Sequence, residues 1–125
     1  MKLACGTDLV SIARMEKAIV QPRFVEKVFT EGEVAYCADK HSPAQHYAAR
    51  FAAKEAVAKA LGTGIAQGVS LTSIEVVHNE DGKPEVRLSG GAKARFEQMG
   101  GIQIELSLTH TDTDALAFVV LTYEG

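Results

Sequence analysis

The chain has 125 residues, of which 46% are hydrophobic and 23% charged, and its formal net charge is −3 at pH 7. This size and composition predict one domain over residues 1–125 and exclude a disordered or fibrous chain. The weakly acidic balance argues against a general nucleic-acid binder, and no apolar run approaches the roughly 20 residues of a membrane span.

The first predicted element is a short apolar strand over residues 3–10, which carries the carboxylate of Asp8 near its end. A helix is expected to follow over residues 11–20. Ser11 is its expected N-cap, because a serine oxygen can accept a backbone N–H of the first turn, and Pro22 is expected to close it. The chain therefore opens with a strand that leads directly into a helix.

Capping boxes mark the next two predicted helices. Thr30 and Glu33 have the required spacing and indicate a short helix. Ser42 and Gln45 repeat that spacing before a long helix over residues 43–61, which has a proline at its first position. This segment is rich in alanine, lysine, glutamate and arginine, which are strong helix formers, and a glycine follows it directly.

The second half of the chain is predicted to consist mainly of strands. Strands are expected where apolar and β-branched residues dominate: residues 73–78, 84–89, 102–109 and 115–123. The last of these is expected to be a buried strand. Asp81-Gly82 is a hairpin turn signal, and residues 91–99 indicate a short helix. Because helices lead and strands follow, the sequence predicts an α+β domain with an antiparallel sheet.

One acidic residue interrupts an apolar face of the long helix. Helical spacing puts five residues on this face: Ala44, Ala48, Phe51, Glu55 and Ala58. Because burying an unpaired carboxylate is costly, Glu55 needs a compensating partner. Lys59, four residues further on, could form an ion pair with it, and a bound metal ion is the alternative.

Asp8 is the second unusual carboxylate, since it lies at the end of an apolar strand. It could cap the following helix, or it could project from a rigid element into a site. Together with Glu55 it could hold Mg²⁺, which prefers oxygen ligands and often takes the remaining ones from water and substrate phosphates. On the residues alone, both interpretations of Asp8 stay open.

Two groups of side chains could donate hydrogen bonds to phosphate oxygens. One lies on the long helix: Arg50, Lys54 and Lys59. The other ends a predicted strand: Ser107, Thr109 and His110. An ordinary solvated helix face is the alternative for the first group, and a position at a turn is the alternative for His110.

Five segments, in order along the chain, resemble the holo-acyl-carrier-protein synthases, the small group of the 4′-phosphopantetheinyl transferases. They are Gly6-Thr7-Asp8-Leu9-Val10, residues 50–60 (R-F-A-A-K-E-A-V-A-K-A), Gly62-Thr63-Gly64-Ile65, Gly82-Lys83-Pro84 and Ser107-Leu108-Thr109-His110. The resemblance covers nearly the whole chain, and the lysine–glutamate segment with the early aspartate is its most specific part. It implies the 4′-phosphopantetheinyl transferase fold, with helices packed on an antiparallel sheet around one long central helix.

This resemblance implies an enzyme that transfers 4′-phosphopantetheine from coenzyme A to a serine of an apo-acyl carrier protein and releases adenosine 3′,5′-bisphosphate. Asp8 and Glu55 would bind Mg²⁺ together with the pyrophosphate of coenzyme A. A water bound to the metal would take the proton of the carrier serine, and either carboxylate could accept that proton from the water. Lys59 would stabilise or protonate the departing phosphate. The residues implied to hold the nucleotide are Arg50, Lys54, Gly62, Thr63, Gly64, Lys83, Pro84, Ser107, Thr109 and His110.

The expected macromolecular partner is an acyl carrier protein, which is acidic. Residues 1–30 carry five basic and three acidic side chains, net +2, whereas residues 31–125 carry eight basic and thirteen acidic ones, net −5. The basic residues expected to dock the carrier protein are Arg14, Lys17, Arg23 and Lys27. The resemblance further implies a role in fatty acid biosynthesis and a homotrimer with active sites between subunits, in which residues 115–123 could be buried on both faces.

Two cysteines, Cys5 and Cys37, are too few for a disulfide framework, and the N-terminus shows no signal-peptide pattern. We therefore expect free thiols and a cytoplasmic protein. The alternative function is a catalytically idle module that binds coenzyme A or the carrier protein. Such a module would keep the nucleotide contacts and lose the metal-binding pair of Asp8 and Glu55 or lose Lys59, and all three residues are present.

Overall fold

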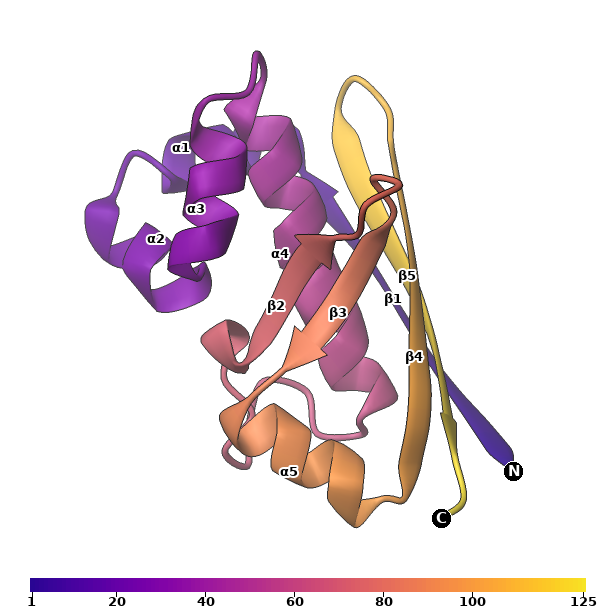
Figure 1. Ribbon diagram of the computed structural model, residues 1–125. Helices are drawn as coiled ribbons and strands as arrows, with labels where there is room; N and C mark the ends of the chain where they lie inside the picture. Colours follow the sequence, from indigo (N-terminus) through magenta and orange to yellow (C-terminus); the bar gives the residue numbers. More distant parts are fainter.

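The computed structural model describes residues 1–125, with helices concentrated in the first half and strands in the second (Figure 1). The helices are α1 (Ile12–Ala18), α2 (Pro22–Val28), α3 (Glu31–Ala38), α4 (Pro43–Ala60) and α5 (Gly90–Gln98), with a 3-10 turn at Leu71–Ser73. The strands are β1 (Lys2–Ser11), β2 (Ile74–His78), β3 (Pro84–Leu88), β4 (Gly101–His110) and β5 (Asp114–Tyr123). The predicted α+β class is confirmed. None of the helices has the length and apolar character needed to cross a membrane.

The helix predicted over residues 11–20 is present as α1, and a second helix that was not predicted, α2, follows it. Ser11 caps α1 as predicted, since its Oγ accepts the N–H of Arg14 at 3.2 Å. However, α1 ends at Ala18, and Pro22 begins α2 instead of closing the earlier helix. A proline fits the first turn of a helix because the N–H that it lacks would have no partner there. The interpretation of Pro22 as a helix terminator is therefore wrong.

The two predicted capping boxes have different outcomes. Thr30 and Glu33 form theirs at the start of α3. Ser42 makes no hydrogen bond as a side-chain cap, so the predicted box with Gln45 is absent. α4 still begins at Pro43, because the fixed backbone angle of proline suits the first helical position without a cap.

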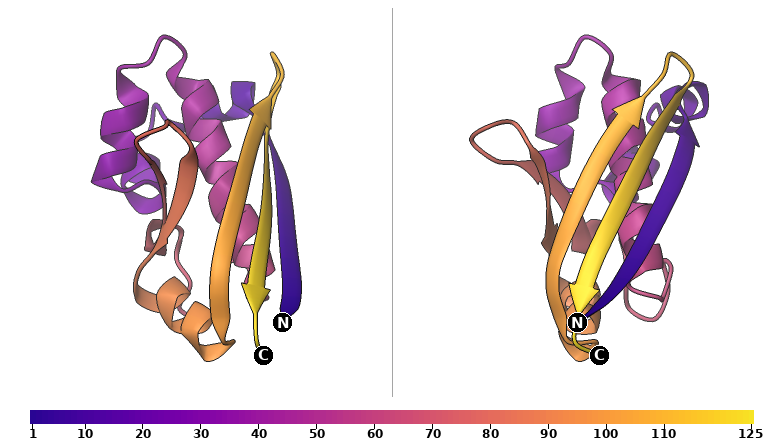
Figure 2. Two further views of the ribbon diagram at one scale, coloured as in Figure 1. Left: turned by 45° about the vertical axis from the view of Figure 1, so that its right-hand side comes forward. Right: turned by 90° about the vertical axis from the view of Figure 1, so that its right-hand side faces the viewer.

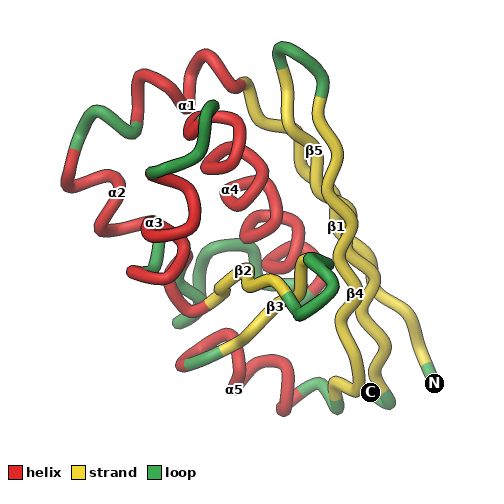
Figure 3. The backbone as a smooth tube through the Cα atoms, turned by 45° about the horizontal axis from the view of Figure 1, so that its top comes forward, coloured by secondary structure: helices red, strands yellow, loops and turns green.

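The strands form two sheets, where the sequence predicted one. β1, β5 and β4 make an antiparallel sheet with β5 in the centre, and β2 and β3 make a separate antiparallel hairpin. The hairpin turn contains Gly82 with φ of +81°, in agreement with the Asp-Gly signal. Figures 2 and 3 show α4 along one face of the three-stranded sheet, with α3 on the other side of α4. The hairpin lies beside β4, where β3 contacts β4 and β2 contacts α4.

α4 approaches β1 closely because small residues meet at the contact. Most buried residues of α4 are alanines, including Ala52, Ala53, Ala56 and Ala60. Gly6 lies on the β1 face that meets α4, and any Cβ there would overlap the carbonyl oxygen of Ala56. Asp8 is two residues further along and so points to the same face. The close contact therefore sets the position of Asp8 relative to α4.

β5 is buried on one face only, so the prediction of a fully buried strand is half right. Toward α4 it presents Ala115, Ala117, Val119 and Leu121, all fully buried. On the opposite face of the sheet, Phe118 is 45% exposed, and Leu3 and Leu9 of β1 are 68% and 63% exposed. Figure 2 shows no helix or strand over this side, which we call the outward face.

Candidate active site

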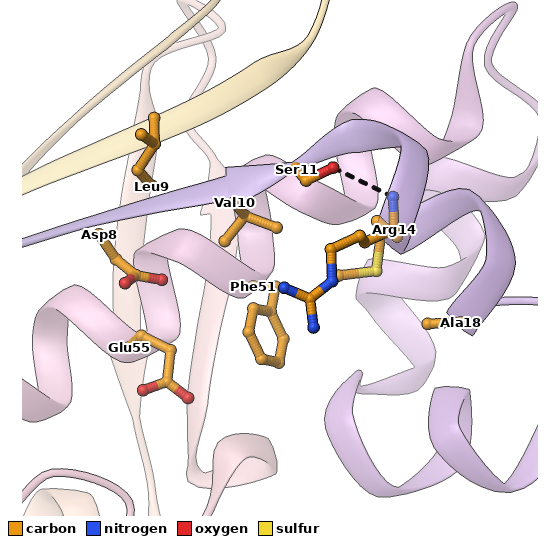
Figure 4. A pocket seen from close by; sticks show the side chains of 9 residues that line it. Asp8, Leu9, Val10, Ser11, Arg14, Ala18, Phe51 and Glu55 are labelled. Atoms are coloured by element: carbon orange, nitrogen blue, oxygen red, sulfur yellow. Dashed lines mark hydrogen bonds between the residues drawn. The ribbon is translucent and has the colours of Figure 1, made fainter.

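A cleft of about 390 Å³ lies between β1, α1 and α4 (Figure 4). It is called the first cleft here. Asp8 from β1 and Glu55 from α4 both line it, and Figure 4 shows their carboxylates pointing into the same space. Arg14 from α1 and Phe51 from α4 also line it. The fold thus brings together the two carboxylates that the sequence singled out.

Glu55 faces Asp8 and has no cation within ion-pairing distance. Burial raises the pKa of Glu55, repulsion from Asp8 raises it further, and the charge of Lys59 opposes the shift. The ion pair considered between Glu55 and Lys59 is absent. Lys59 Nζ instead lies 3.3 Å from Asp8 Oδ1 and donates to the carbonyl oxygen of Thr7 at 2.8 Å.

The donor atoms of the first cleft fit a divalent cation. Two carboxylates on one cleft repel each other, and a cation between them relieves the repulsion. Asp8 is not required as a helix cap, because Ser11 caps α1. No third side chain of His, Cys, Asp or Glu joins the pair. This donor set suits Mg²⁺, which commonly takes its other ligands from water and phosphate.

One of the four predicted docking residues lines the first cleft. Arg14 extends from α1, and Figure 4 shows its guanidinium beside the ring of Phe51. The other three are exposed on α1 and α2: Lys17, Arg23 and Lys27. Arg14 therefore connects this basic segment with the two carboxylates.

A second cleft, of about 230 Å³, contains four of the residues predicted to hold the nucleotide: Arg50, Pro84, Thr109 and His110. They come from α4, β3 and β4. Because an α-helix turns about 100° per residue, Arg50 and Glu55 lie on different sides of α4. One helix thus contributes to both clefts.

Three further residues of the second cleft were not predicted as site residues: Tyr36, His46 and His78. The ring of His78 stacks on that of Tyr36 with 4.4 Å between centroids, and the guanidinium carbon of Arg50 lies 4.1 Å from the Tyr36 centroid. His46 precedes Arg50 by four residues, a spacing that could have revealed it. Tyr36 and His78 carry no such local signal, since only the tertiary fold brings them to Arg50.

Lys54 is fully buried and reaches neither cleft, which contradicts the prediction that it contacts the nucleotide. Its Nζ lies 2.6 Å from Glu33 Oε1 and donates to the carbonyl oxygens of Leu71 and Ile74. These contacts use all three ammonium donors. Glu33 Oε2 also accepts the N–H of Val76. Burial lowers the pKa of Lys54 and attraction to Glu33 opposes that shift, so the pair is a structural link between α3, α4 and β2.

The remaining predicted nucleotide residues lie outside both clefts. Lys83 Nζ lies 2.8 Å from Glu105 Oε1 at the surface. Ser107 pairs with Phe118 in the sheet register and shares the outward face. The turn Gly62-Thr63-Gly64 follows the end of α4, with positive φ at both glycines. One chain by itself therefore does not gather the whole predicted set.

Known proteins resemble this chain over almost its full length. The family model of the 4′-phosphopantetheinyl transferase superfamily matches residues 4–118. A holo-[acyl-carrier-protein] synthase from Ruminiclostridium cellulolyticum is 44% identical over 125 aligned residues, which cover 98% of this chain and 93% of that protein. A holo-[acyl-carrier-protein] synthase from Geobacter sp. (strain M21) is 47% identical over 118 aligned residues, which cover 93% of this chain and 94% of that protein. The crystal structure of Helicobacter pylori holo-[acyl-carrier-protein] synthase in complex with coenzyme A has a TM-score of 0.83 and 32% identity, covering 94% of this chain and 99% of that one.

Proposed function

The chain belongs to the 4′-phosphopantetheinyl transferase superfamily, and from this premise we propose how its residues act. It transfers the 4′-phosphopantetheine group of coenzyme A to a serine of an acyl carrier protein, as expected from relatives that are holo-[acyl-carrier-protein] synthases. The other product is adenosine 3′,5′-bisphosphate. The observation that carries the proposed mechanism is the pair of Asp8 and Glu55 in the first cleft.

Asp8 and Glu55 would hold Mg²⁺ together with the pyrophosphate of coenzyme A. When bound, the metal neutralises negative charge that develops on the phosphate under attack. Burial raises the pKa of Glu55 and repulsion from Asp8 raises it further, and a cation between the two carboxylates would offset that repulsion, which supports this assignment. The reaction should therefore depend on a divalent cation.

The side chains around the first cleft serve the transfer itself. The serine oxygen forms a bond to the phosphorus that bears the pantetheine arm, and the P–O bond to the nucleotide phosphate breaks. Because a protonated serine is a poor nucleophile, Asp8 or Glu55 accepts its proton, directly or through a water. Lys59, held by Asp8 and the Thr7 carbonyl, stabilises or protonates the departing phosphate.

The second cleft would hold the nucleotide part of coenzyme A. Arg50 is only 2% exposed, and its Nε has no hydrogen-bond partner. A buried guanidinium that forms no ion pair with a carboxylate favours an anionic ligand. Pro84, Thr109 and His110 line the same cleft and would contact the nucleotide beside Arg50.

The basic side chains of α1 and α2 would dock the carrier protein. The docking residues are Arg14, Lys17, Arg23 and Lys27. Arg14 is the one that also lines the first cleft, so a carrier protein bound there brings its serine close to Asp8 and Glu55. Attraction between basic and acidic surfaces speeds the encounter and weakens as salt is added.

A homotrimer with active sites between subunits would cover the outward face. Its exposed apolar residues include Leu3, Leu9 and Phe118, and such a surface favours a protein partner. Leu9 also lines the first cleft, so a subunit bound to the outward face would lie beside that cleft. The nucleotide-binding residues that were predicted but lie outside both clefts would then contact coenzyme A at the interface between subunits. They are Gly62, Thr63, Gly64, Lys83 and Ser107.

The cellular setting of the reaction is also part of the proposal. Both cysteines are free, which agrees with a reducing compartment and a cytoplasmic protein. The holo-acyl carrier protein made here would carry acyl chains in fatty acid biosynthesis. A catalytically idle binding module is the alternative, and the common location of Asp8, Glu55 and Lys59 argues against it.

Intact mass spectrometry tests the proposed reaction directly. The enzyme is incubated with an apo-acyl carrier protein, coenzyme A and Mg²⁺, with a parallel EDTA control. We expect the carrier to gain one phosphopantetheine mass, and only without EDTA. No gain with several carrier proteins, despite binding of coenzyme A, would favour the idle module. No gain and no binding would reject the assignment.

A further inference from the structure

Arg50 is held in the second cleft by groups that a phosphate could replace. Its Nη1 donates to the carbonyl oxygen of His46 at 3.2 Å, and its Nη2 lies 3.3 Å from Nε2 and 3.4 Å from Nδ1 of the His78 ring. Its Nε has no partner. A guanidinium has no acceptor, so the His78 nitrogen that it meets must carry a free lone pair. This contact therefore favours the neutral form of His78.

The surroundings of the two histidines are cationic. Four charged or titratable residues face the two histidines. They are Tyr36 on α3, Lys40 just after α3, Arg50 on α4 and His110 at the end of β4. Burial lowers the pKa of both His46 and His78, and the charges of Arg50 and Lys40 lower it further. Without an anion in the cleft, these surroundings favour the neutral form of both rings.

A phosphate dianion next to Arg50 reverses this balance. It offers Nη2 a stronger acceptor than a neutral imidazole and so releases the His78 nitrogen. An adjacent negative charge favours the protonated form of a histidine. The released nitrogen can then bind a proton and donate to the phosphate. The same attraction acts on His46, one helical turn before Arg50.

We propose that His46 and His78 bind the nucleotide phosphate of the donor beside Arg50 and take up protons as it binds. This inference rests on the proposed function, since it needs the nucleotide in the second cleft. It adds two binding residues and predicts tighter nucleotide binding at lower pH. The gain in nucleotide affinity is complete at pH values below the pKa of the histidines in the free protein. It is lost as the pH rises through the pKa of the histidines in the complex.

Calorimetry of adenosine 3′,5′-bisphosphate binding tests the proposal. Titrations near pH 7 in two buffers with different ionisation enthalpies give the number of protons taken up. We expect uptake in the native protein and a smaller uptake in His78→Asn and in His46→Asn. The control is His41→Asn, because His41 is exposed and outside the cleft. The titration of the phosphate itself is common to all variants and cancels in the differences.

The pH dependence of the dissociation constant gives a second measurement. Between the free and bound pKa values, each linked histidine contributes up to about a tenfold change in affinity per pH unit. His78→Lys places a permanent cation at the site, so it should bind the nucleotide tightly at pH 8 and lose part of the pH dependence. Adenosine without phosphate should cause no proton uptake in any variant.

Two results would overturn the inference while leaving the proposed function intact. One is equal proton uptake by the native protein and a His46→Asn/His78→Asn double variant, both with normal circular dichroism. The other is tight nucleotide binding whose dissociation constant changes with pH in the same way in the native protein and in both single histidine variants. Failure of the proposed function is a separate outcome, because it appears as the absence of carrier modification in the mass assay.

Discussion

Glu55 and Lys54 are adjacent in the sequence, yet the fold puts their charges in opposite environments. Glu55 faces Asp8 across the first cleft, where the two carboxylates repel each other. Lys54 is turned into the core and pairs with Glu33. Because neighbouring residues on a helix differ by about 100° in direction, a single signature segment supplies both a site residue and a structural one.

Glu55→Gln tests the role of the site residue. The substitution keeps the size of the side chain and removes the charge that would bind Mg²⁺. We expect transfer to fall by about a hundredfold or more, since a metal contributes several kcal/mol to the barrier. The melting temperature should stay equal or rise slightly, because ionised Glu55 is disfavoured by burial and by Asp8. Full transfer at ordinary Mg²⁺ concentration would refute the metal assignment.

Lys54→Met tests the structural residue. It leaves the Glu33 carboxylate buried without its partner, which should cost about 3–5 kcal/mol of unfolding free energy in urea. Lys59→Met is the matched control on the same helix, because Lys59 is half exposed and its ion pair should contribute only about 0–1 kcal/mol. Equal losses in the two variants would contradict the structural role of Lys54.

At the level of elements, α1 and α4 connect the proposed docking surface with the two clefts. α4 supplies Glu55 to one cleft and Arg50 to the other. α1 follows β1 without a loop, so the strand that carries Asp8 also determines where Arg14 lies. The short distance along the chain between Asp8 and Arg14 links the carrier-docking surface to the reacting carboxylates.

Arg14→Ala tests that link. We expect the apparent KM for the carrier protein to rise roughly fivefold, equivalent to about 1 kcal/mol, with a smaller change in kcat. The rise should shrink at high salt, because the attraction is screened. Lys93→Ala on α5 is the control, since it removes the same charge from an exposed position outside the first cleft. An unchanged KM for Arg14→Ala would remove this residue from the docking surface.

At the level of the whole molecule, one chain leaves the apolar outward face uncovered. β5 packs alanines and aliphatic residues against α4 but presents Phe118 on the other side. Leu9 belongs to this face and to the rim of the first cleft. Assembly and catalysis are thus expected to be coupled.

Phe118→Asp tests this coupling. A carboxylate at the centre of the outward face should convert the proposed trimer to monomers in sedimentation experiments and reduce transfer at least about tenfold, because burying the charge in an interface is costly. Ala94→Asp at an exposed position on α5 is the control and should change neither property. A native protein that sediments as a monomer and is fully active would contradict the trimer proposal.

The sequence by itself determined the α+β class, the long helix and the hairpin turn, and it singled out Asp8 and Glu55 as the candidate site residues, because these depend on periodicity, local turn chemistry and ordered motifs. It failed where a feature depends on distant partners. Lys54 is buried with Glu33, and the strands divide into two sheets. Pro22 is a local ambiguity instead, because a proline can begin a helix as well as follow one.

Only the tertiary structure decided that Tyr36 and His78 meet at Arg50 and that β5 keeps one face uncovered. The physical reason is that the direction of a side chain follows from local backbone geometry, whereas its neighbours follow from the packing of segments far apart in the chain.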